Sequence, residues 1–510
     1  MADDDALNKV DVVIIGGGLA GLSAALKLKD ENDLRQLRQK PPISYVVLEA
    51  DDRLGGRTWS KEPDKDYGGG YVGATQNYIQ NLIRRYGIPI IEEYLPQDGR
   101  WLFEDSQGNL SCYAGNNPYD LPGGANAVQC LGLLDAMTLE MRAHLDDPSK
   151  SRLKTEDERT VQAWIEEQQA LFAATQGAAG MSPLTTEAFT ASVRSAFSLE
   201  PRELSPFFLL YYAATAGGYS ALVDVAGGDG AAEATRFANG TKDLVDAIAA
   251  DVGADNIQLE VQVKSVASNA DGALVSTDSG QWQAKNVIVA MAPPASARIE
   301  FSRSPKHDAQ WKMRDALSSA MDKALGRTIK GFVRFKRPFW RLQDPILMGY
   351  VLSMAADYKQ FPLDWTLDNV WDAPAPPSGS PPPTGPRQIV SLMTFIVGDA
   401  AAYWSGRDPT ERATAVIAHL KKIYKFDDSE LFNPDELASN YAEEDWPLQR
   451  SRGVGAPDAM MPPGALSQFG AALRASIGPI HWAGAETASE WCGYMNGAIE
   501  SGIRAASEVI

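Results

Sequence analysis

The stretch Val12-Val13-Ile14-Ile15-Gly16-Gly17-Gly18-Leu19-Ala20-Gly21 decides the fold of this chain. Its four β-branched residues favour a strand that is buried on both faces, and residues 22–28 continue as an apolar stripe at helical spacing. The turn between them carries glycine at Gly16, Gly18 and Gly21. Glycine at these places permits a tight turn, a close approach of the backbone to a pyrophosphate, and close packing of the helix on the strand. The stretch therefore predicts a strand, turn and helix whose free N–H groups face a dinucleotide.

A second predicted strand, over residues 43–48, ends in Glu49. An acidic side chain at that place can accept hydrogen bonds from the ribose hydroxyls of an adenosine. Glu49 lies further past Gly21 than the usual interval of about 20 residues. The excess indicates a polar insertion around residues 30–42.

The segment Arg53-Leu54-Gly55-Gly56-Arg57-Thr58 is a second glycine turn, and two arginines flank it. A nicotinamide dinucleotide does not need such a turn. A flavin adenine dinucleotide (FAD), threaded lengthwise through a protein, needs backbone close to its phosphates and cations against its pyrophosphate. Ordinary glycine turns in a βαβ unit remain the alternative, but both glycine clusters and Glu49, in this order, favour FAD.

Composition and charge restrict the class of protein. The chain has 510 residues, which is enough for two to four domains of about 150 residues each. Its formal net charge at pH 7 is −19. Such a field repels nucleic acid and anionic membranes, and it mildly concentrates cationic molecules such as protonated amines. We therefore expect neither a nucleic acid nor a membrane as a partner.

Cysteine and histidine give no sign of a disulfide framework or a metal site. The three cysteines and four histidines are scattered, without the spacing of a zinc site: Cys112, Cys130, Cys492, His144, His307, His419 and His481. Cysteine usage favours a reducing compartment, and neither a signal peptide nor a membrane tail is evident. We expect no metal cofactor and a cytoplasmic protein, with a peroxisomal location left open.

The middle of the chain interrupts the nucleotide-binding unit. The run Gly68-Gly69-Gly70 leads into residues 71–77, and this density of glycine is typical of backbone that approaches a ligand closely. Residues 156–212 show apolar positions at helical spacing, and a strand is predicted over residues 257–263. A buried strand over residues 286–290 then indicates that the chain returns to the nucleotide domain after a long excursion.

We predict an α/β fold with two discontinuous domains. One is a Rossmann-like FAD-binding domain, and the other is an α+β substrate-binding domain with a mixed sheet flanked by helices. The predicted boundaries are 1–88, 221–301 and 440–510 for the first domain, and 89–220 and 302–439 for the second. Within the second domain, the proline-rich residues 373–386 cannot pair in a sheet and predict a surface loop.

With these motifs in hand, the chain resembles the flavin amine oxidases, and it is most similar to the monoamine oxidase branch of that family. The matches follow one order over residues 10–510, although residues 115–235 match only loosely. Beyond the two glycine turns, the matching segments are 71–77, 290–294, Thr328-Ile329-Lys330-Gly331, Phe339-Trp340, Trp446, Met461-Pro462-Pro463-Gly464, Ala483-Gly484-Ala485-Glu486-Thr487 and 491–497.

The resemblance implies which residues contact the cofactor. Glu49 would hold the adenosine ribose, Arg57 and the glycine turns the phosphates, and Val263 the adenine through its backbone. Glu486 and Thr487 would contact the ribityl and phosphate region. Further cofactor contacts are implied at Gly73, Ala74, Thr75, Trp446, Gly484 and Met495.

Three residues are implied to act at the reacting end of the cofactor. Lys330 corresponds to the family's lysine that holds a water near flavin N5; a lysine is costly to bury, so its place there suggests a task such as assisting reoxidation by oxygen. A snorkelling surface lysine is the alternative. Trp446 resembles the tryptophan that packs beside the flavin, with a core aromatic as the alternative, and Tyr494 resembles one aromatic wall of the substrate cage.

One segment departs from the family pattern. In animal monoamine oxidases, a cysteine upstream of the Pro-Pro-Gly sequence links covalently to the flavin, and an aromatic residue of the cage follows it. Here residues 452–458 read Arg-Gly-Val-Gly-Ala-Pro-Asp and contain neither. We therefore expect non-covalent FAD and a pocket that is wider or differently shaped, with Tyr494 as the clear aromatic wall. Cys492 is expected to be a packed residue rather than a reactive thiol.

The resemblance implies oxidative deamination of an amine by O2, which gives an imine or aldehyde, ammonia or an amine, and hydrogen peroxide. Two alternatives remain: an L-amino-acid oxidase, which needs an arginine for the substrate carboxylate, and a polyamine oxidase, which needs carboxylates along its tunnel. Retention of Lys330, Trp446 and Tyr494 argues against a non-catalytic flavoprotein scaffold. The expected partners are a small-molecule amine and O2, and a homodimer is the expected assembly.

Overall fold

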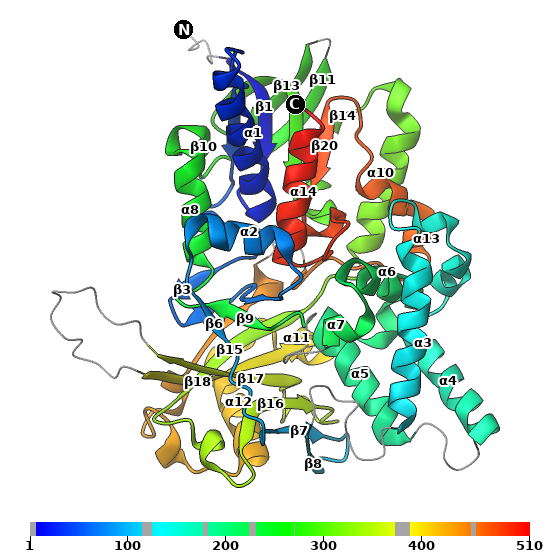
Figure 1. Cartoon of the computed structure of the whole chain (residues 1–510), viewed down its shortest axis with the longest axis vertical. Helices are drawn as coiled ribbons and strands as arrows, with labels where there is room; N and C mark the ends of the chain where they lie inside the picture. Colours follow the sequence, from blue (N-terminus) through cyan, green and yellow to red (C-terminus); the bar gives the residue numbers. More distant parts are fainter. Residues whose placement is uncertain are drawn as a thin grey trace, which may run out of the picture.

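The computed structural model describes residues 7–114, 125–176, 182–223, 231–269, 271–372, 388–449 and 455–510. The predicted proline-rich loop lies outside the described residues, and so do residues 452–454 of the segment that departs from the family pattern. Figure 1 shows one sheet in the upper half of the molecule, a second sheet in the lower half, and a group of helices beside the second sheet.

The glycine-rich stretch lies at the centre of the upper sheet. β1 (Asn8–Ile15) pairs in parallel with β2 (Tyr45–Leu48) on one side and with β13 (Gln281–Ala290) on the other. The strand order is β10-β2-β1-β13-β12-β11-β14, and β20 (Ile480–Ala483) also pairs with β13 in parallel. The residues of β1 from Val12 to Ile15 are at most 4% exposed, so the predicted strand with two covered faces is confirmed.

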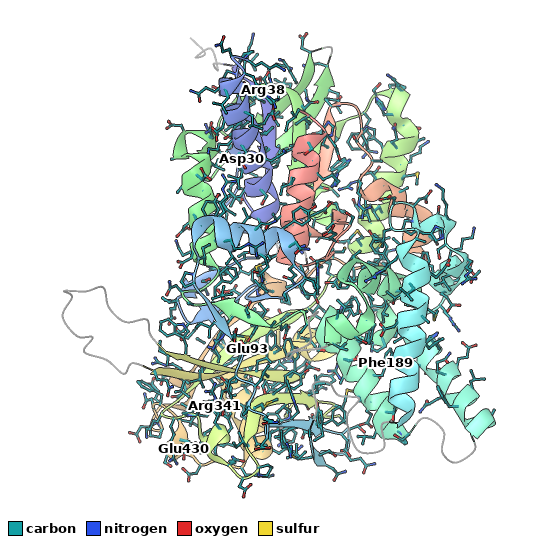
Figure 2. The ribbon with its side chains drawn as sticks, viewed as in Figure 1. Asp30, Arg38, Glu93, Phe189, Arg341 and Glu430 are labelled. Carbon is teal, nitrogen blue, oxygen red and sulfur yellow. The ribbon has the colours of Figure 1, made fainter. Side chains whose placement is uncertain are left out.

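Two helices that are far apart in sequence cover one face of this sheet. α1 (Leu19–Leu37) lies against α14 (Met495–Ser507), where a Cβ atom at Gly502 would lie 2.1 Å from the carbonyl oxygen of Ala20. α1 also contains much of the predicted polar insertion, and its outer end lies between Asp30 and Arg38 in Figure 2. The Asn32 side chain exchanges hydrogen bonds of 2.8 and 2.7 Å with the backbone of Ile43, so this insertion is a helical extension tied to the start of β2.

Other elements complete this half: β10 (Ile257–Gln258), β11 (Val263–Asn269), β12 (Gly272–Thr277), β14 (Glu300–Ser302), α2 (Asn77–Tyr86), α8 (Lys242–Val252), α9 (Pro293–Ser296), α10 (Asp308–Met321) and α13 (Ala465–Phe469). The prediction of one strand over residues 257–263 is wrong. β10 lies at the edge beside β2, whereas β11 lies between β12 and β14. The chain must leave the first strand to reach the second, and Glu260 adopts a φ of 57° in between.

The lower sheet has the strand order β19-β15-β18-β17-β16-β7-β8. Its strands are β7 (Arg100–Glu104), β8 (Leu110–Tyr113), β15 (Thr328–Phe335), β16 (Leu347–Ser353), β17 (Trp365–Asp372), β18 (Gln388–Val397) and β19 (Tyr441–Asp445). Neighbouring strands are antiparallel except for β16 and β7, so the sheet is mixed, as predicted. α11 (Gly398–Trp404) and α12 (Pro409–Tyr424) share an apolar core with it. β19 belongs to this sheet, although the predicted boundary at residue 440 assigned it to the FAD-binding domain.

Short strands lie between the two large sheets: β3 (Ser60–Glu62) pairs with β4 (Lys65–Asp66), and β9 (Thr235–Phe237) pairs with both β5 (Tyr71–Val72) and β6 (Ile90–Glu92). The group of helices comprises α3 (Ala125–Arg142), α4 (Val161–Gln176), α5 (Pro183–Phe197), α6 (Pro206–Ala216) and α7 (Tyr219–Val223). Every residue of α6 is buried, because this apolar helix lies in the middle of the group. Among the described residues, no helix is long and apolar enough to cross a lipid bilayer.

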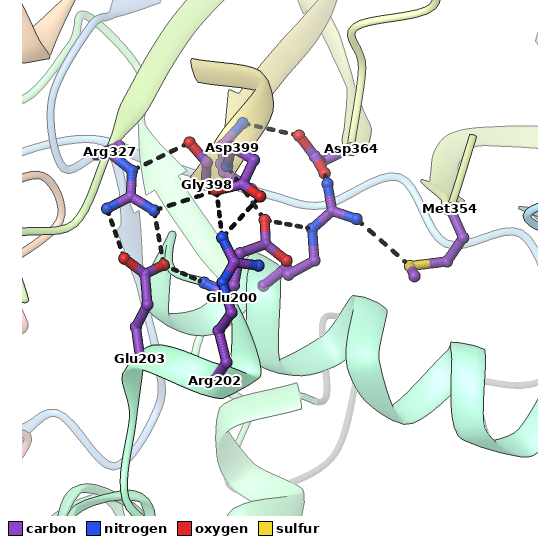
Figure 3. Close-up of polar contacts among 10 residues, drawn as sticks. Glu200, Arg202, Glu203, Arg327, Met354, Asp364, Gly398 and Asp399 are labelled. Carbon is purple, nitrogen blue, oxygen red and sulfur yellow. Dashed lines mark hydrogen bonds and ion pairs between the residues drawn. The ribbon is translucent and has the colours of Figure 1, made fainter. Parts of the chain in front are cut away.

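A network of ion pairs joins this group of helices to the lower sheet (Figure 3). Arg327, just before β15, pairs with Glu203 at 2.6 Å, and Arg202 pairs with Asp399 at the start of α11 at 2.7 Å. Arg194 of α5 pairs with the buried Asp364 just before β17. The network fixes α5 against the sheet, and the next residues of that helix line the large cavity described below.

A buried cluster around Glu104 holds α12 against the lower sheet. Glu104 is fully buried and accepts hydrogen bonds from His419 Nε2 (2.7 Å), Lys422 Nζ (2.5 Å) and Ser353 Oγ (2.7 Å). The Leu363 backbone N–H donates to His419 Nδ1 at 3.0 Å, so Nε2 carries the imidazole proton. Burial works to raise the pKa of Glu104, but these hydrogen bonds outweigh it and hold the pKa at about 2.

Replacing Glu104 by glutamine should lower the free energy of unfolding by about 1.5 to 3 kcal/mol at pH 7, because a charged acceptor of three donors is lost. A depressed pKa contributes stability above the unfolded value of about 4.5, and that stability is lost as the pH falls toward 2. Thermal unfolding of the wild type and of Glu104→Gln between pH 7 and pH 3 measures the stability lost on substitution and the stability lost as the pH falls. The exposed Glu300→Gln is the control, and equal melting temperatures for all three proteins would contradict this role of Glu104.

Candidate functional site

One large cavity, of about 630 Å³, connects the two sheets. It begins at the carboxyl ends of β1 and β2, where Gly16 and Glu49 line its wall, and it extends to Trp365 and Phe395 of the lower sheet. Ligands of open α/β sheets bind at the carboxyl ends of parallel strands. The cavity is therefore large enough, and correctly placed, for an extended nucleotide cofactor together with a small substrate.

The glycine turn leaves free space beside its backbone at the end of the cavity near β1 and β2, which we call the nucleotide end. A Cβ atom at Gly18 would meet only the carbonyl oxygen of Gly55, at 3.9 Å, among the described residues. A Cβ atom at Gly21 would lie 1.9 Å from the carbonyl oxygen of Gly16, so Gly21 serves the packing of α1 on β1 and does not line the cavity. The space beside Gly18 fits a phosphate held against backbone N–H groups, as predicted for a dinucleotide.

Glu49 is held in place by the turns around it. The N–H group of Gly17 donates to Glu49 Oε2 at 2.6 Å, and the N–H group of Asp51 donates to Oε1 at 2.9 Å. Burial raises the pKa of Glu49, and these hydrogen bonds oppose that effect. Both oxygens keep a further lone pair, so the carboxylate can still accept a ribose hydroxyl. Val263 lines the same end of the cavity, where the resemblance places the adenine.

Arg57 lies between two buried carboxylates. Its Nη1 atom is 2.5 Å from Asp458 Oδ1 and 2.9 Å from Glu486 Oε1, and it also donates to the carbonyl oxygen of Pro457 at 2.9 Å. Arg57 lines the cavity, whereas Glu486 lies behind it. Because the guanidinium is already paired with two carboxylates, it is less available to a phosphate than an unpaired arginine, and phosphate contact by Arg57 stays a prediction. Glu486 holds Arg57 in place.

Some predicted cofactor residues line the cavity and others do not. Gly484, Met495 and Trp446 line it, together with Gly16, Gly18, Glu49, Arg57 and Val263. Gly73, Ala74 and Thr75 do not; they lie between β5 and α2, and a Cβ atom at Gly73 would lie 2.5 Å from the carbonyl oxygen of Ala231. Thr487 is fully buried and donates its hydroxyl to the carbonyl oxygen of Gly484 at 2.9 Å. Cofactor contact by these four residues stays a prediction.

The lower sheet supplies one wall of the cavity through residues that are neighbours across its strands. Lys330 of β15 is opposite Phe395 of β18, which is opposite Trp365 of β17. The Lys330 ammonium lies 5.4 Å from the centre of the Phe395 ring and donates to the carbonyl oxygen of Gly68 at 2.8 Å. Burial lowers the pKa of Lys330 to about 8, although Asp66 and Glu233 partly oppose this. Lys330 is therefore a buried amine in the cavity wall and not a surface lysine.

Trp446 follows β19 and packs beside the glycine run. Its indole N–H donates to the carbonyl oxygen of Tyr67 at 2.8 Å, and its ring lies 6.2 Å from that of Trp59 in an edge-to-face arrangement. Trp446 is 6% exposed and lines the cavity. Trp446 is thus both a core aromatic and a cavity residue, because its indole N–H is hydrogen-bonded to the backbone while its ring borders the cavity.

Among the aromatic residues of the cavity wall, Tyr212 packs beside Tyr494. Tyr212 of α6 lines the wall, and its ring centre is 5.9 Å from that of Tyr494, with an angle of 43° between the rings. Gly493 adopts a φ of 85°, and a Cβ atom there would lie 2.3 Å from the Tyr212 hydroxyl, so glycine is required at that position. Pro457 lines the cavity without an aromatic ring, and Tyr212 supplies aromatic surface from another element; the loss of one wall of the substrate cage stays a prediction.

No sequence pattern marks Tyr212 as a cavity residue. It lies in a helix in which every residue is apolar, aromatic or small and buried, so its spacing resembles that of a core residue. Glu233 also lines the cavity and was not predicted, because it stands alone between small residues without a motif. Cys492 is buried and contacts the carbonyl oxygen of Glu486 through its Sγ atom at 3.6 Å, and burial raises its pKa well above the usual value, which fits a packed thiol.

The chain is similar to known proteins over nearly its whole length. A model of the family described as flavin containing amine oxidoreductase matches residues 19–510. The chain is 30% identical over 512 residues to the probable flavin-containing monoamine oxidase A of Dictyostelium discoideum, with 98% of this chain and 97% of that protein covered. It is 29% identical over 516 residues to the flavin-containing amine oxidase B of Homo sapiens, with 99% and 86% covered.

Solved structures agree with this similarity. The cyclohexylamine oxidase of Brevibacterium oxydans superimposes with a TM-score of 0.76 at 26% identity, over 98% of both chains. Putrescine oxidase superimposes with a TM-score of 0.77 at 22% identity, over 99% of both chains, and at that identity it supports the fold alone.

Changing Gly18 to alanine should weaken flavin binding by about 10- to 100-fold, because a methyl group separates the backbone from the phosphates and removes charged hydrogen bonds. The protein itself has space for the methyl group, so the variant should fold normally. The ratio of flavin to protein absorbance after gel filtration measures flavin binding, and circular dichroism measures folding. Gly132→Ala, in α3, has open space around it and is the control. Full flavin content in Gly18→Ala would contradict the prediction that a phosphate of the flavin lies against the backbone of Gly18.

Proposed function

This chain belongs to the flavin containing amine oxidoreductase family, and from that membership we infer that it oxidises primary or secondary amines with bulky apolar groups by O2, using non-covalent FAD. The products would be an imine or aldehyde, ammonia or an amine, and hydrogen peroxide. The observation that carries this proposal is the part of the cavity that we call its aromatic end, which is lined by Tyr212, Tyr494, Trp365, Phe395 and Lys330 and belongs to the same cavity as the nucleotide end.

FAD would lie lengthwise in the cavity. The glycine turns and Glu49 would hold its nucleotide half, and Trp446, Met495 and Gly484 would border its other half. A bound flavin would accept the α-hydrogen and the electrons of the amine. The open backbone beside Gly18 and the hydrogen-bonded Glu49 support this assignment.

The chain's own residues position the substrate and exclude water. The rings of Tyr212 and Tyr494 present aromatic faces that orient an amine nitrogen, and the apolar surroundings favour its neutral, reactive form. Lys330 is retained in the cavity wall at the cost of burying an amine, which supports a role in the reaction, such as assistance to its oxygen half. Each of these roles is a proposal.

The charges of the cavity argue against an L-amino acid as the substrate. Among the described lining residues, the cations are Arg57, Arg298 and Lys330. Arg57 is paired with carboxylates, and Arg298 follows α9, which begins beyond the carboxyl end of β13 at the nucleotide side. Only Lys330 is at the aromatic end, and Glu233 would repel a substrate carboxylate. We therefore favour amines over L-amino acids, and we retain the predicted homodimer and cytoplasmic location as proposals.

Acid precipitation should release the flavin into the supernatant. The support is the segment around Pro457, which offers neither a cysteine nor another nucleophile to the flavin. Absorbance spectra of the supernatant and fluorescence of the washed pellet give the measurement. Flavin that stays with the pellet would contradict non-covalent binding, and Cys492 would then be the first residue to test.

A peroxide-coupled assay should show turnover with arylalkyl or alkyl monoamines and little with L-amino acids. Tyr494→Ala should lose most of this activity, about 10-fold or more in kcat/KM, because the aromatic face that orients the nitrogen is removed. Tyr403→Ala, a half-buried tyrosine of α11 outside the cavity, serves as the control. A higher kcat/KM for L-phenylalanine than for phenethylamine would replace this proposal with an L-amino-acid oxidase.

A further inference from the structure

Two parts of the cavity wall come from separate elements that one ion pair ties together. The end of α5 contributes Ser195 and Ala196, and the start of β17 contributes Trp365. The residues directly before them in the chain are Arg194 and Asp364, which form the ion pair. Neither member of the pair is among the described residues that line the cavity, so the pair lies behind the wall that it joins.

Asp364 is fixed in the lower sheet by its backbone and by its side chain. Its N–H group donates to the carbonyl oxygen of Phe395 at 2.9 Å, and its carbonyl oxygen accepts from the N–H group of Ser353 at 2.7 Å. Its Oδ2 atom accepts from the N–H group of Val397 at 2.7 Å, and its Oδ1 atom faces Arg194. The Asp364 carboxylate is therefore a fixed point of the sheet to which α5 is attached.

Arg194 lies in the last turn of α5 and extends to the sheet. Besides Asp364, its guanidinium contacts Glu200 Oε1 and Met354 Sδ, each at 3.6 Å (Figure 3). The side chains of Arg194 and Asp364 are 13% and 5% exposed, so the ion pair is largely shielded from water. Removing one partner of a buried pair is strongly destabilising, whereas a surface pair contributes little. The pair is thus suited to hold the end of α5 at a set distance from the sheet.

The position of Trp365 depends on its backbone and on its stacking. Its ring stacks on that of Phe395, with ring centres 3.6 Å apart and an angle of 4° between the planes. Its indole N–H group is buried and has no hydrogen-bond partner in the described part of the chain, so no polar contact holds the ring from its edge. Asp364, the next residue in the chain, is therefore a direct link between this ring and α5.

We propose that the ion pair of Arg194 and Asp364 selects among amines by shape, because it sets the distance between the end of α5 and Trp365 and so limits the width of the apolar group that fits. The inference rests on the proposed function and adds a pair of positioning residues to it. Without the pair, the two parts of the wall can separate. A wide, two-ring amine then gains relative to a one-ring amine, since closely packed side chains give way only when their support is removed.

The test compares benzylamine, with one ring, and naphthylmethylamine, with two rings, by kcat/KM from peroxide release by the holoenzyme. Arg194→Met and Asp364→Asn should each shift the ratio by about 10-fold or more toward the two-ring amine. Asparagine keeps an oxygen for the Val397 N–H group, so this change removes mainly the ion pair. Because the two residues act as one unit, the double variant should shift the ratio no further than either single variant.

The double variant also keeps the test decisive if a single variant does not fold, since it leaves neither member of the pair as an unpaired buried charge. Arg202→Met is the control. Arg202 belongs to the same network and pairs with Asp399 at 2.7 Å, but its side chain is 56% exposed. This variant should keep the wild-type ratio. An unchanged ratio in the double variant, or an equal shift in Arg202→Met, would overturn the inference.

A binding measurement separates this inference from the proposed function. Forms of the two amines whose nitrogen-bearing carbon carries two methyl groups have no α-hydrogen and are not oxidised. Calorimetry with the holoenzyme should show the ratio of their dissociation constants shifted by about 10-fold or more toward the two-ring probe in the double variant, and unshifted in Arg202→Met. The same ratio in the double variant and the wild type would contradict the role of the pair. Turnover of no amine at all, with this shift in binding intact, would contradict only the proposed function.

Discussion

The parallel hydrogen bonding of β1 to β2 and β13 is the constraint on which the rest of the structure depends. It brings the carboxyl ends of these strands to one edge, where Gly16, Glu49 and Ala290 line the same cavity. β20 pairs with β13 and adds Gly484 from the other end of the chain. The cavity continues from this edge to Trp365 and Phe395 of the lower sheet, so it directs a long cofactor toward that sheet.

The lower sheet and the group of helices complete the cavity with a different chemistry. Cross-strand neighbours place Lys330 beside aromatic rings, and α6 contributes Tyr212 from a fully buried helix. The two ends of the cavity also differ in whether their charged side chains form ion pairs. At the nucleotide end, Arg57 is balanced by two carboxylates, whereas the buried Lys330 and the half-buried Glu233 of the cavity wall form no ion pair with each other. The Glu233 carboxylate, whose Oε2 atom has no hydrogen-bond partner in the protein, is therefore suited to meet a ligand.

Long-range polar contacts fix the helices and the lower sheet relative to one another. The ion-pair network around Arg194 and Arg327 joins α5 to the start of β15 and to α11, and the Glu104 cluster joins α12 to β7. Each network contains buried charges with several partners, so breaking one partner leaves the others without compensation. The wall that α5 contributes to the cavity is fixed in this way.

The sequence by itself determined the features that depend on local chemistry. The run of β-branched residues, the glycines after it and Glu49 are close in the chain, and hydrogen bonding within one βαβ unit gives them their positions. The resemblance to a family added Lys330, Trp446 and Tyr494, and the structure places all three in the cavity wall. Only the tertiary structure decided that Gly73 lies outside that wall, that Tyr212 lies beside Tyr494, and that Glu233 faces the cavity without a partner. These outcomes depend on packing between segments that are far apart in the chain, and the burial of a side chain, or the absence of its partner, is a property of that packing and not of the residues next to it in sequence.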